Sequence, residues 1–582
     1  MLKRTVFNSD IDENLVSKEV VVNGWIHRKR NLGGILFFDL RDRSGLVQVV
    51  VYPNAIDKVR FEELESLKIE SVLGVKGVVK RRENPNVNLK TGYFEIELKD
   101  YEIFSRAQDL PFNPFSDQII DETLRLKYRY LDLRKEEVRR IFELRAKITQ
   151  TIRQFLISKD FIEVETPNLT KSTPEGARDF LVPSRINKGH FYALPQSPQL
   201  FKQILMIGGF EKYFQIARCF RDEDLRVDRQ PEFTQIDLEL SFVEQEDIIN
   251  LVEEMFKTLF REVMNIEIQT PFPRMTYKDA MRNFGSDKPD TRFDLHIQDI
   301  TNAFKDTQLK ILQNTKENLI LALSIPEKAN LSRNEIKNLK EATKQFGVVG
   351  FIEFKIIDNH IESSYEKYLS DEEKNAILKI AKNGDLLTLF SVPKKGGFET
   401  LGRIRLYFGE TFNLIKKNLW NFLWIVDFPF FSFSEEEGRY VAEHHPFTMP
   451  NIDDLPKLES DKEDVRAIAY DLVLNGSELG GGSIRIHDPE LQKRVFKAIG
   501  LKDEEIESRF GFLINAFKYG APPHGGIAFG LDRLVWLLSN AKSLRDVIAF
   551  PKTTSGTCPL TDAPSEVDKK QLEELGLQIK NG

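Results

Sequence analysis

The sequence predicts a multidomain α+β protein, with a small β-barrel, an antiparallel-sheet domain in two parts, and an inserted α/β domain between those parts. Three observations support this fold class. The first stretch of about 100 residues has short strands separated by turns. A long amphipathic helix then precedes strand-rich hairpins, and the composition between about 290 and 415 changes to alternating helix and strand units. At 582 residues the chain has room for about three or four domains.

The predicted barrel occupies residues 1–105. Four stretches carry β-branched and aromatic residues with Gly and Asn between them, namely 19–30, 34–52, 71–82 and 93–105. Four or five strands in so short a stretch are typical of a small closed barrel. Residues 106–135 follow as a predicted hinge or linker. The start of this segment contains prolines, and its apolar residues recur with neither a helical nor a strand spacing.

The main sheet domain is predicted at 136–289 and again at 416–582, where a C-terminal extension is included, with the inserted domain at 290–415. Its first element is a helix, because apolar residues recur on one helical stripe. These residues are Val138, Ile141, Leu144, Ile148, Ile152 and Phe155.

Composition excludes several classes of protein. The two cysteines, Cys219 and Cys558, are too few for a disulfide framework, which indicates a reducing compartment. The sequence shows neither the apolar core of a signal peptide nor an apolar membrane span, so a cytoplasmic protein without a membrane partner is expected. The formal net charge of -7 argues against indiscriminate nucleic-acid binding, although a local basic surface remains compatible with it.

The segment "FRDEDLRVDRQPEFTQIDLEL", residues 220–240, places interleaved charges between two strand-like runs. An ordinary solvent-exposed loop would account for charged residues. It would not account for so many polar side chains close together between two strands, namely Arg221, Glu223, Arg229 and Gln230. We therefore expect a long hairpin whose loop binds a ligand.

The segment "AYDLVLNGSELGGGSIRIH", residues 469–487, predicts a second hairpin. Asn475 and Gly476 suit a type I′ turn, in which both residues have positive φ. Such a turn pairs Val473 with Glu478 and places Asp471 on the face of Glu478. Two adjacent carboxylates suit a Mg²⁺ that also binds phosphates, and the alternative is a pair of solvated carboxylates on an edge strand.

Arg485 lies beyond the turn on the same hairpin. On an unbroken ladder its side chain faces away from Glu478, whereas a bulge in the run Gly480–Gly482 changes that face. The spacing alone leaves a surface arginine as an equal interpretation.

Two further segments have charge patterns that suit anions. "GGIAFGLDRLVWLLSN", residues 525–540, predicts a strand, a turn at Gly530 and a helix with Arg533 in its first turn. An arginine there suits a phosphate, because free N–H groups and the helix dipole favour an anion, but an arginine that only caps the helix at the surface is the more frequent arrangement. In the barrel, Phe37 and Phe38 are adjacent on a strand within a basic surface, so one of them faces outward. An outward aromatic here stacks an unpaired base or makes an ordinary edge contact.

Together these segments resemble the class II aminoacyl-tRNA synthetases. "FIEVETPNLT" with Pro167, "FRDEDLRVDRQPEFTQIDLEL" and "GIAFGLDRLVWLL" look like motifs 1, 2 and 3 in that order. "STPEGARDFLVPS", "QSPQLFKQ", "AEHHPFT" and "GGGSIRIH" are similar to the amino-acid pocket of bacterial aspartyl-tRNA synthetases, and the insertion is similar to that of their bacterial members. The resemblance covers nearly the whole chain.

The resemblance implies an α+β synthetase with an OB-fold barrel, ATP and Mg²⁺ as its substrate and cofactor, and L-aspartate and tRNA(Asp) as partners in a homodimer joined through motif 1. The implied catalytic residues are Arg221, Glu223 and Arg533, and Asp471 and Glu478 hold the metal. The implied ATP-binding residues are Arg221, Asp222, Glu223, Gln230, Phe233, Glu478, Gly530, Leu531, Asp532 and Arg533. Those implied for aspartate are Glu175, Ser197, Gln199, Lys202, Arg221, Asp237, His444 or His445, and Arg485; those for the anticodon are Arg30, Phe37 and Gln48.

The reaction implied is activation of aspartate to aspartyl-adenylate, followed by transfer to the 3′ end of tRNA. The nearest alternatives are asparaginyl- and lysyl-tRNA synthetases, against which Arg485, Lys202 and the insertion argue, because an arginine fork pairs with a carboxylate. A non-catalytic tRNA-binding paralogue is the other alternative, and the presence of the catalytic and metal residues argues against it. Charging of tRNA(Asn) in addition stays open at this point.

Overall fold

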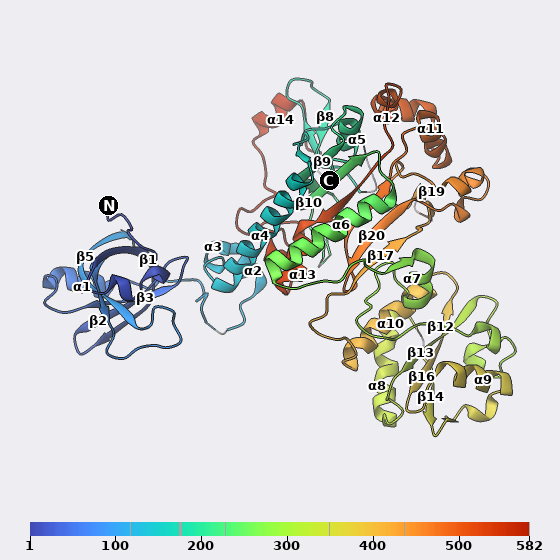
Figure 1. Ribbon diagram of the computed structural model, residues 1–582, viewed down its shortest axis with the longest axis horizontal. Helices are drawn as coiled ribbons and strands as arrows, with labels where there is room; N and C mark the ends of the chain where they lie inside the picture. Colours follow the sequence, from blue (N-terminus) through green and yellow to red (C-terminus); the bar gives the residue numbers. More distant parts are fainter. Residues whose placement is uncertain (117, 174–176, 227, 349, 436, 581–582) are drawn as a thin grey trace. The chain divides into compact units, whose positions relative to one another are not determined.

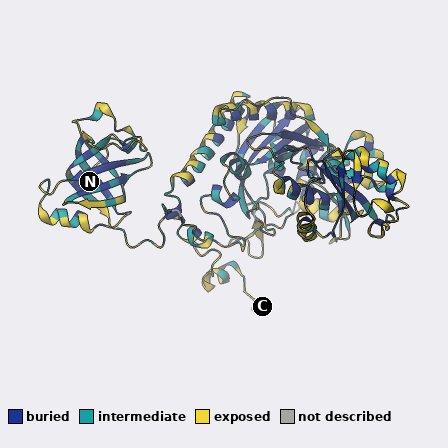
Figure 2. Ribbon diagram, turned by 90° about the horizontal axis from the view of Figure 1, so that it is seen from below, coloured by how far each residue is buried: buried dark blue, intermediate teal, exposed yellow. Residues whose placement is uncertain are grey.

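The computed structural model describes residues 1–116, 118–173, 177–226, 228–348, 350–435 and 437–580 (Figure 1). The chain divides into two units, Met1–Ile120 and Asp121–Gly582, each with its own core. Strands are mainly buried, and helices expose one side (Figure 2). Within the described ranges, no helix is both long and apolar enough to cross a bilayer.

The first unit is a closed five-stranded barrel with strand order β1-β2-β3-β5-β4, as the sequence predicts. Its elements are β1 (Glu19–Leu32), β2 (Ile35–Arg41), β3 (Leu46–Val51), α1 (Lys58–Ser66), β4 (Val72–Arg81) and β5 (Phe94–Ser105). Alternation along β2 turns Phe38 into the core, where it is fully buried, and leaves Phe37 half-buried on the opposite side.

The second unit is built on an eight-stranded, mainly antiparallel sheet with strand order β11-β17-β20-β21-β22-β10-β9-β6. The strands are β6 (Ile162–Glu163), β9 (Lys212–Phe220), β10 (Glu232–Ser241), β11 (Arg274–Thr276), β17 (Phe422–Val426), β20 (Ala469–Leu474), β21 (Ser477–Ile484) and β22 (His524–Gly530). Two small hairpins accompany the sheet, β7 (Leu181–Pro183) with β8 (Phe191–Ala193) and β18 (Phe431–Ser434) with β19 (Arg439–Ala442).

Helices cover one face of this sheet, and a second hydrophobic core covers only part of the other face, which leaves room there for a pocket. On α4 (Glu136–Ser158) the predicted apolar stripe is confirmed, because Val138 is buried and the other five residues pack into or against the core beneath the sheet. The same core includes residues of α6 (Gln245–Leu259) and α13 (Leu531–Ser539) (Figure 1). On β10, Ile236, Leu238 and Leu240 face this core, so the alternate residues Gln235, Asp237 and Glu239 face the pocket side.

The remaining helices of the unit flank the sheet. They are α2 (Glu122–Lys127), α3 (Arg129–Asp132), α5 (Gln199–Ile207), α7 (Tyr277–Phe284), α11 (Pro489–Ala498), α12 (Asp503–Phe517) and α14 (Lys569–Leu575). The later part of the predicted linker is thus helical, and the buried guanidinium of Arg129 donates to the carbonyls of Ile548 and Ala549 at 3.1 and 3.0 Å.

The predicted inserted region contains a second sheet with strand order β12-β13-β16-β14-β15. Its elements are β12 (Gln298–Asp299), β13 (Asn318–Ile325), α8 (Arg333–Thr343), β14 (Ile352–Ile357), β15 (His360–Glu362), α9 (Asp371–Ile380), β16 (Leu386–Pro393) and α10 (Gly397–Thr411). Helices alternate with strands along the chain, while the strand pairs are antiparallel. The exact domain boundaries that the sequence suggests stay predictions.

Candidate active site

The opposite face of the eight-stranded sheet, which a second hydrophobic core covers in part, carries a cavity of about 370 Å³. Its floor includes one row of residues across four strands, in which Asp237, Ala528, Gly481 and Asp471 are successive pairing partners. A Cβ atom on Gly481 would lie 2.5 Å from Oδ1 of Asp471. A side chain at this position would therefore collide with the carboxylate of Asp471, and only glycine fits.

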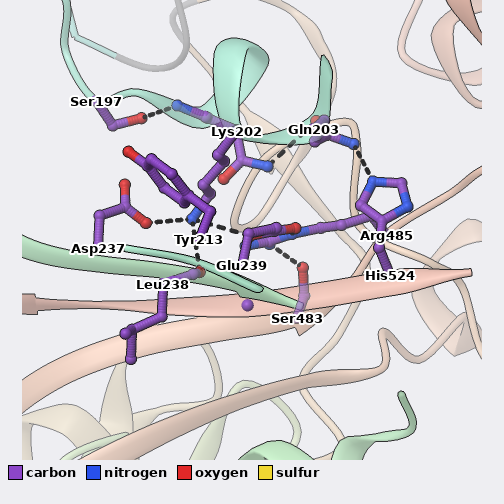
Figure 3. A network of polar contacts seen from close by, with 12 residues as sticks. Ser197, Lys202, Gln203, Tyr213, Asp237, Leu238, Glu239, Ser483, Arg485 and His524 are labelled. Atoms are coloured by element: carbon purple, nitrogen blue, oxygen red, sulfur yellow. Dashed lines mark hydrogen bonds and ion pairs between the residues drawn. The ribbon is translucent and has the colours of Figure 1, made fainter. Parts of the chain in front are cut away.

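At one end of the cavity lies a cluster of four buried charges, Lys202, Asp237, Glu239 and Arg485, here called the four-charge cluster (Figure 3). Lys202 on α5 contacts Asp237, and its Nζ lies 3.1 Å from Oε2 of Glu239. Arg485 donates to both carboxylate oxygens of Glu239, through Nε at 2.9 Å and a terminal nitrogen at 3.1 Å. Two buried cations thus balance two buried anions beside the cavity.

The two carboxylates of the four-charge cluster differ in their electrostatics. Burial raises the pKa of Glu239, but Arg485 and Lys202 outweigh it and lower this pKa to about 2. For Asp237, burial prevails over Lys202, so its pKa is raised. Oδ2 of Asp237 is buried and has no hydrogen-bond partner among the described residues, so this oxygen can accept from a ligand.

The adjacent histidines have separate partners. Nε2 of His445 accepts from Arg485 at 2.8 Å, and burial together with the charge of Arg485 lowers the pKa of His445 well below its ordinary value. His444 instead places Nε2 3.3 Å from Oδ1 of Asp471. Burial lowers the pKa of His444, but Asp471 outweighs that effect and raises it.

The hairpin of β20 and β21 confirms the predicted turn, since Asn475 and Gly476 have φ of 52° and 81° and Val473 pairs with Glu478. The ladder then shifts at Leu479, because Leu472 pairs with Gly480. This extra residue reverses the alternation of β21. Arg485 therefore lines the same cavity as Glu478.

Asp471 and Glu478 both line the cavity. Burial and the neighbouring charge of Asp471 raise the pKa of Glu478. The described residues include no group of three or more metal-binding side chains. Two carboxylates nevertheless fit a Mg²⁺ whose other ligands are waters and phosphates.

The loop between β9 and β10 forms another wall of the cavity. The guanidinium of Arg221 lies 5.1 Å from the ring centre of Phe233, and Arg229 donates to Glu223 at 2.9 Å. The side chain of Gln230 binds the protein backbone: its amide makes hydrogen bonds of 2.8 and 3.0 Å with the backbone of Lys552.

At the start of α13, Arg533 faces the cavity and donates to the carbonyl of Glu478 at 2.8 Å. Asp532 also borders the cavity, but its carboxylate accepts from Arg145 at 2.6 Å and from the backbone of Thr234 at 2.8 Å. Leu531 packs into the core. These contacts hold the helix start in place around Arg533.

The barrel carries the other predicted site. Arg30 pairs across the strands with Phe37, and its guanidinium lies 3.3 Å from the side-chain oxygen of Gln48 and 3.4 Å from Asp39. Gln48 in turn donates to Glu95 at 2.7 Å. An aromatic side chain, a cation and an amide thus share one face of the barrel.

Two family models match the chain. One, described as tRNA synthetases class II (D, K and N), matches residues 121–554, and the other, an OB-fold nucleic acid binding domain, matches residues 20–104. The first covers more than half of the chain. The chain belongs to the class II tRNA synthetases. As a member of this family it is an aminoacyl-tRNA ligase, for which ATP, an amino acid and tRNA are substrates.

Relatives of this synthetase align over almost all of its length. The aspartate--tRNA(Asp/Asn) ligase of Caldanaerobacter subterraneus subsp. tengcongensis is 49% identical over 585 residues, covering 99% of this chain and 98% of the relative. The aspartate--tRNA ligase of Bacillus licheniformis is 49% identical over 589 residues, covering 100% and 99%.

Solved synthetase structures share the fold. The asparaginyl-tRNA synthetase of Pyrococcus horikoshii in complex with asparaginyl-adenylate has a TM-score of 0.59 at 20% identity, covering 95% of this chain and 99% of that one. The aspartyl-tRNA synthetase of Entamoeba histolytica has a TM-score of 0.58 at 20% identity, covering 94% and 91%.

The structure brings most of the predicted site residues of this synthetase to the one cavity. They are Ser197, Gln199, Lys202, Arg221, Glu223, Gln230, Phe233, Asp237, His444, His445, Asp471, Glu478, Arg485, Gly530, Asp532 and Arg533. Asp222 and Leu531 do not line it, since Asp222 is exposed and Leu531 lies in the core. Glu175 lies outside the described residues.

Glu239 is the main residue of the synthetase site that the sequence analysis missed. It joins Lys202 to Arg485 although it is not among the predicted ligand contacts. Strand alternation offers the signal, because Glu239 follows Asp237 by two residues in "QIDLEL" and therefore shares its face.

Proposed function

We propose that this class II synthetase activates L-aspartate with ATP and transfers the aspartyl group to the 3′ end of tRNA(Asp). The observation that carries the proposal is the pair of buried cations, Lys202 and Arg485, at the end of the cavity. Lys202 and Arg485 can only donate hydrogen bonds, so they favour the side-chain carboxylate of aspartate, which only accepts, over an amide, which also donates. The names of the two bacterial relatives support the same substrate.

The amino acid would occupy the end of the cavity beside the four-charge cluster. Lys202 and Arg485 would face its side-chain carboxylate, with His445 beside Arg485. The unpartnered Oδ2 of Asp237 and the side chains of Ser197, Gln199 and Glu175 would receive its ammonium group, with His444 closer to Asp471.

ATP would lie along the loop wall and the start of α13. Phe233 would stack on the adenine and Glu223 would contact its edge, with Gln230, Asp222, Gly530, Leu531 and Asp532 shaping the site through backbone or structural contacts. Arg221 would bind the α-phosphate and Arg533 the γ-phosphate. Asp471 and Glu478 would hold Mg²⁺, which when bound supplies charge neutralisation to the phosphates.

The chemistry needs no covalent nucleophile from the protein. An oxygen of the substrate α-carboxylate attacks the α-phosphorus in line, the bond from that phosphorus to the bridging oxygen breaks, and pyrophosphate leaves. A terminal ribose hydroxyl of tRNA then attacks the adenylate carbonyl, loses its proton, and AMP leaves. Arg221, Glu223 and Arg533 contribute by positioning and by neutralising charge.

The proposal assigns the barrel to the anticodon, with Phe37 stacking a base and Arg30 and Gln48 contacting base edges. It also includes a homodimer through the region of motif 1, and a cytoplasmic location. The domains would be 1–105 for the anticodon, 106–135 as hinge, 136–289 and 416–582 for catalysis, and 290–415 as insertion.

ATP–pyrophosphate exchange with aspartate, asparagine and lysine in separate reactions tests the proposal. We expect exchange with aspartate alone. Exchange with asparagine or lysine instead would assign the chain to another member of its family, and no exchange with any amino acid would favour the non-catalytic paralogue. Aminoacylation of tRNA(Asp) and tRNA(Asn) by the same preparation defines the tRNA range.

A further inference from the structure

A row of buried amides and one imidazole lies behind the amino-acid end of the cavity. On α5, Gln199 and Gln203 are one helical turn apart, and Nε2 of Gln199 donates to Oε1 of Gln203 at 3.2 Å. Nε2 of Gln203 lies 3.2 Å from Nε2 of His524, at the start of β22 (Figure 3). Gln203 and His524 are both fully buried.

The carbonyl of Pro522 determines which groups in this row donate and which accept hydrogen bonds. Nδ1 of His524 lies 2.8 Å from the carbonyl oxygen of Pro522. A carbonyl oxygen accepts and never donates, so Nδ1 carries the hydrogen. In a neutral imidazole Nε2 is then the acceptor, and the amide nitrogen of Gln203 must donate to it.

The orientation of the Gln203 amide also determines that of Gln199. Because the nitrogen of Gln203 is directed at His524, its oxygen faces Gln199 and accepts from the nitrogen of that amide. The oxygen of Gln199 is therefore the end left for the cavity, which the Gln199 side chain lines. An oxygen in this position accepts from an ammonium group, whereas a reversed amide would present hydrogens to it.

Burial maintains the neutral state that this direction requires. Burial lowers the pKa of His524, and Arg485 and His487 act in the same direction, whereas Glu239 and the carbonyl of Pro522 act against it. The net pKa is lowered. A doubly protonated ring would donate from Nε2 and so reverse both amides.

We propose that Gln203 and His524 are positioning residues that hold the Gln199 amide with its oxygen toward the substrate ammonium group, and so select a substrate with that group. Neither residue lines the cavity, so they act through Gln199. This inference rests on the proposed activation of aspartate. It adds a specificity determinant that lies behind the residues in contact with the amino acid.

The test compares aspartate with succinate, which has both carboxylates but no ammonium group. In Gln203→Met the shape is kept and both hydrogen bonds are lost. We expect the KM for L-aspartate in ATP–pyrophosphate exchange to rise about tenfold, the scale of one hydrogen bond to a charged group. The inhibition constant of succinate and the KM for ATP should stay within about twofold, because neither molecule has an ammonium group to bind the Gln199 oxygen. A twofold change is smaller than the contribution of one hydrogen bond.

His524→Phe, which keeps a ring but removes the acceptor, should give the same selective rise in the KM for aspartate. If the residues form one chain, the double variant should be no worse than the more affected single variant. Additive effects, an unchanged KM, or an equal weakening of aspartate and succinate would each overturn the positioning role. An inactive wild-type enzyme with aspartate would instead overturn the proposed function, and with it this inference.

Discussion

Two arginine–carboxylate pairs in this synthetase have the same chemistry in opposite surroundings. In the barrel, Arg30 lies 3.4 Å from Asp39, and the two side chains are 49% and 16% exposed. In the catalytic unit, Arg485 lies 2.9 Å from Glu239, with exposures of 2% and 0%. Water screens the first pair, whereas the second pair must be neutralised by its own neighbours. Burial, more than residue type, therefore decides how much each pair matters to the stability of the fold.

The largest effect is expected at Arg485. Arg485→Leu should abolish aspartate-dependent ATP–pyrophosphate exchange while leaving ATP binding largely intact, because loss of a buried charged partner is worth about 2–5 kcal/mol. Exchange and ATP affinity measure the two effects in one preparation. Arg30→Leu is the matched control, and its exchange should equal that of wild type, since adenylate formation needs no tRNA. Undiminished exchange in Arg485→Leu would contradict the assigned role.

Glu239→Gln should lower the free energy of unfolding at neutral pH by about 3–5 kcal/mol, because it leaves two buried cations with a single anion. The folded pKa of Glu239 is lowered from its ordinary value of 4.5 to about 2. Its stabilising contribution is thus present above about pH 4.5 and is lost as the pH falls through about 2.

Denaturant unfolding of both proteins across this pH window measures the effect. The stability of wild type should fall more steeply on acidification than that of Glu239→Gln. Parallel pH profiles would show that the contribution of Glu239 does not depend on its ionisation.

Asp471→Asn and Glu478→Gln test the carboxylate pair. Each should reduce Mg²⁺-dependent exchange by about 100-fold or more, because neutralisation of phosphate charge by a metal is worth several kcal/mol. Binding of tRNA should remain near wild type. Glu490→Gln, an exposed carboxylate on α11, is the control. Wild-type exchange in the pair variants would favour simple solvated carboxylates.

Phe37→Ala should weaken aminoacylation of tRNA by about 1–3 kcal/mol, the value of one base stack, with adenylate formation unchanged. Phe38→Ala should instead lower stability by about 3–5 kcal/mol, because Phe38 fills the barrel core. Thermal melting, exchange and aminoacylation of both variants make the comparison. If neither variant affects charging, the anticodon role of this surface is wrong.

The smallest effect is expected for the partly exposed pair of Arg30 and Asp39. Asp39→Asn should change the free energy of unfolding by about 0.2–1 kcal/mol, and less at high salt. Denaturant unfolding at two ionic strengths measures it. A change as large as that of Glu239→Gln would remove the distinction between the two surroundings.

Much of the local structure could be predicted from the sequence. The strands of the barrel and the stripe on α4 follow from hydrophobic periods of two and 3.6 residues. The turn at Asn475 and Gly476 follows from the few residues that tolerate positive φ. The family motifs likewise pointed to most of the residues that line the cavity. These features depend on neighbours within a few residues, which the sequence displays directly.

Other features were decided only by the tertiary structure. The ladder shift at Leu479 places Arg485 in the cavity. The regular alternation of side chains along a strand does not predict this shift. At Gly480 a Cβ atom would lie 2.2 Å from the carbonyl oxygen of Ala528, so the register depends on close packing against β22. Likewise, the partner of Gln203 is 321 residues away along the chain, at His524. Such contacts depend on which strands and helices meet in space, and that is fixed by the packing of the whole core.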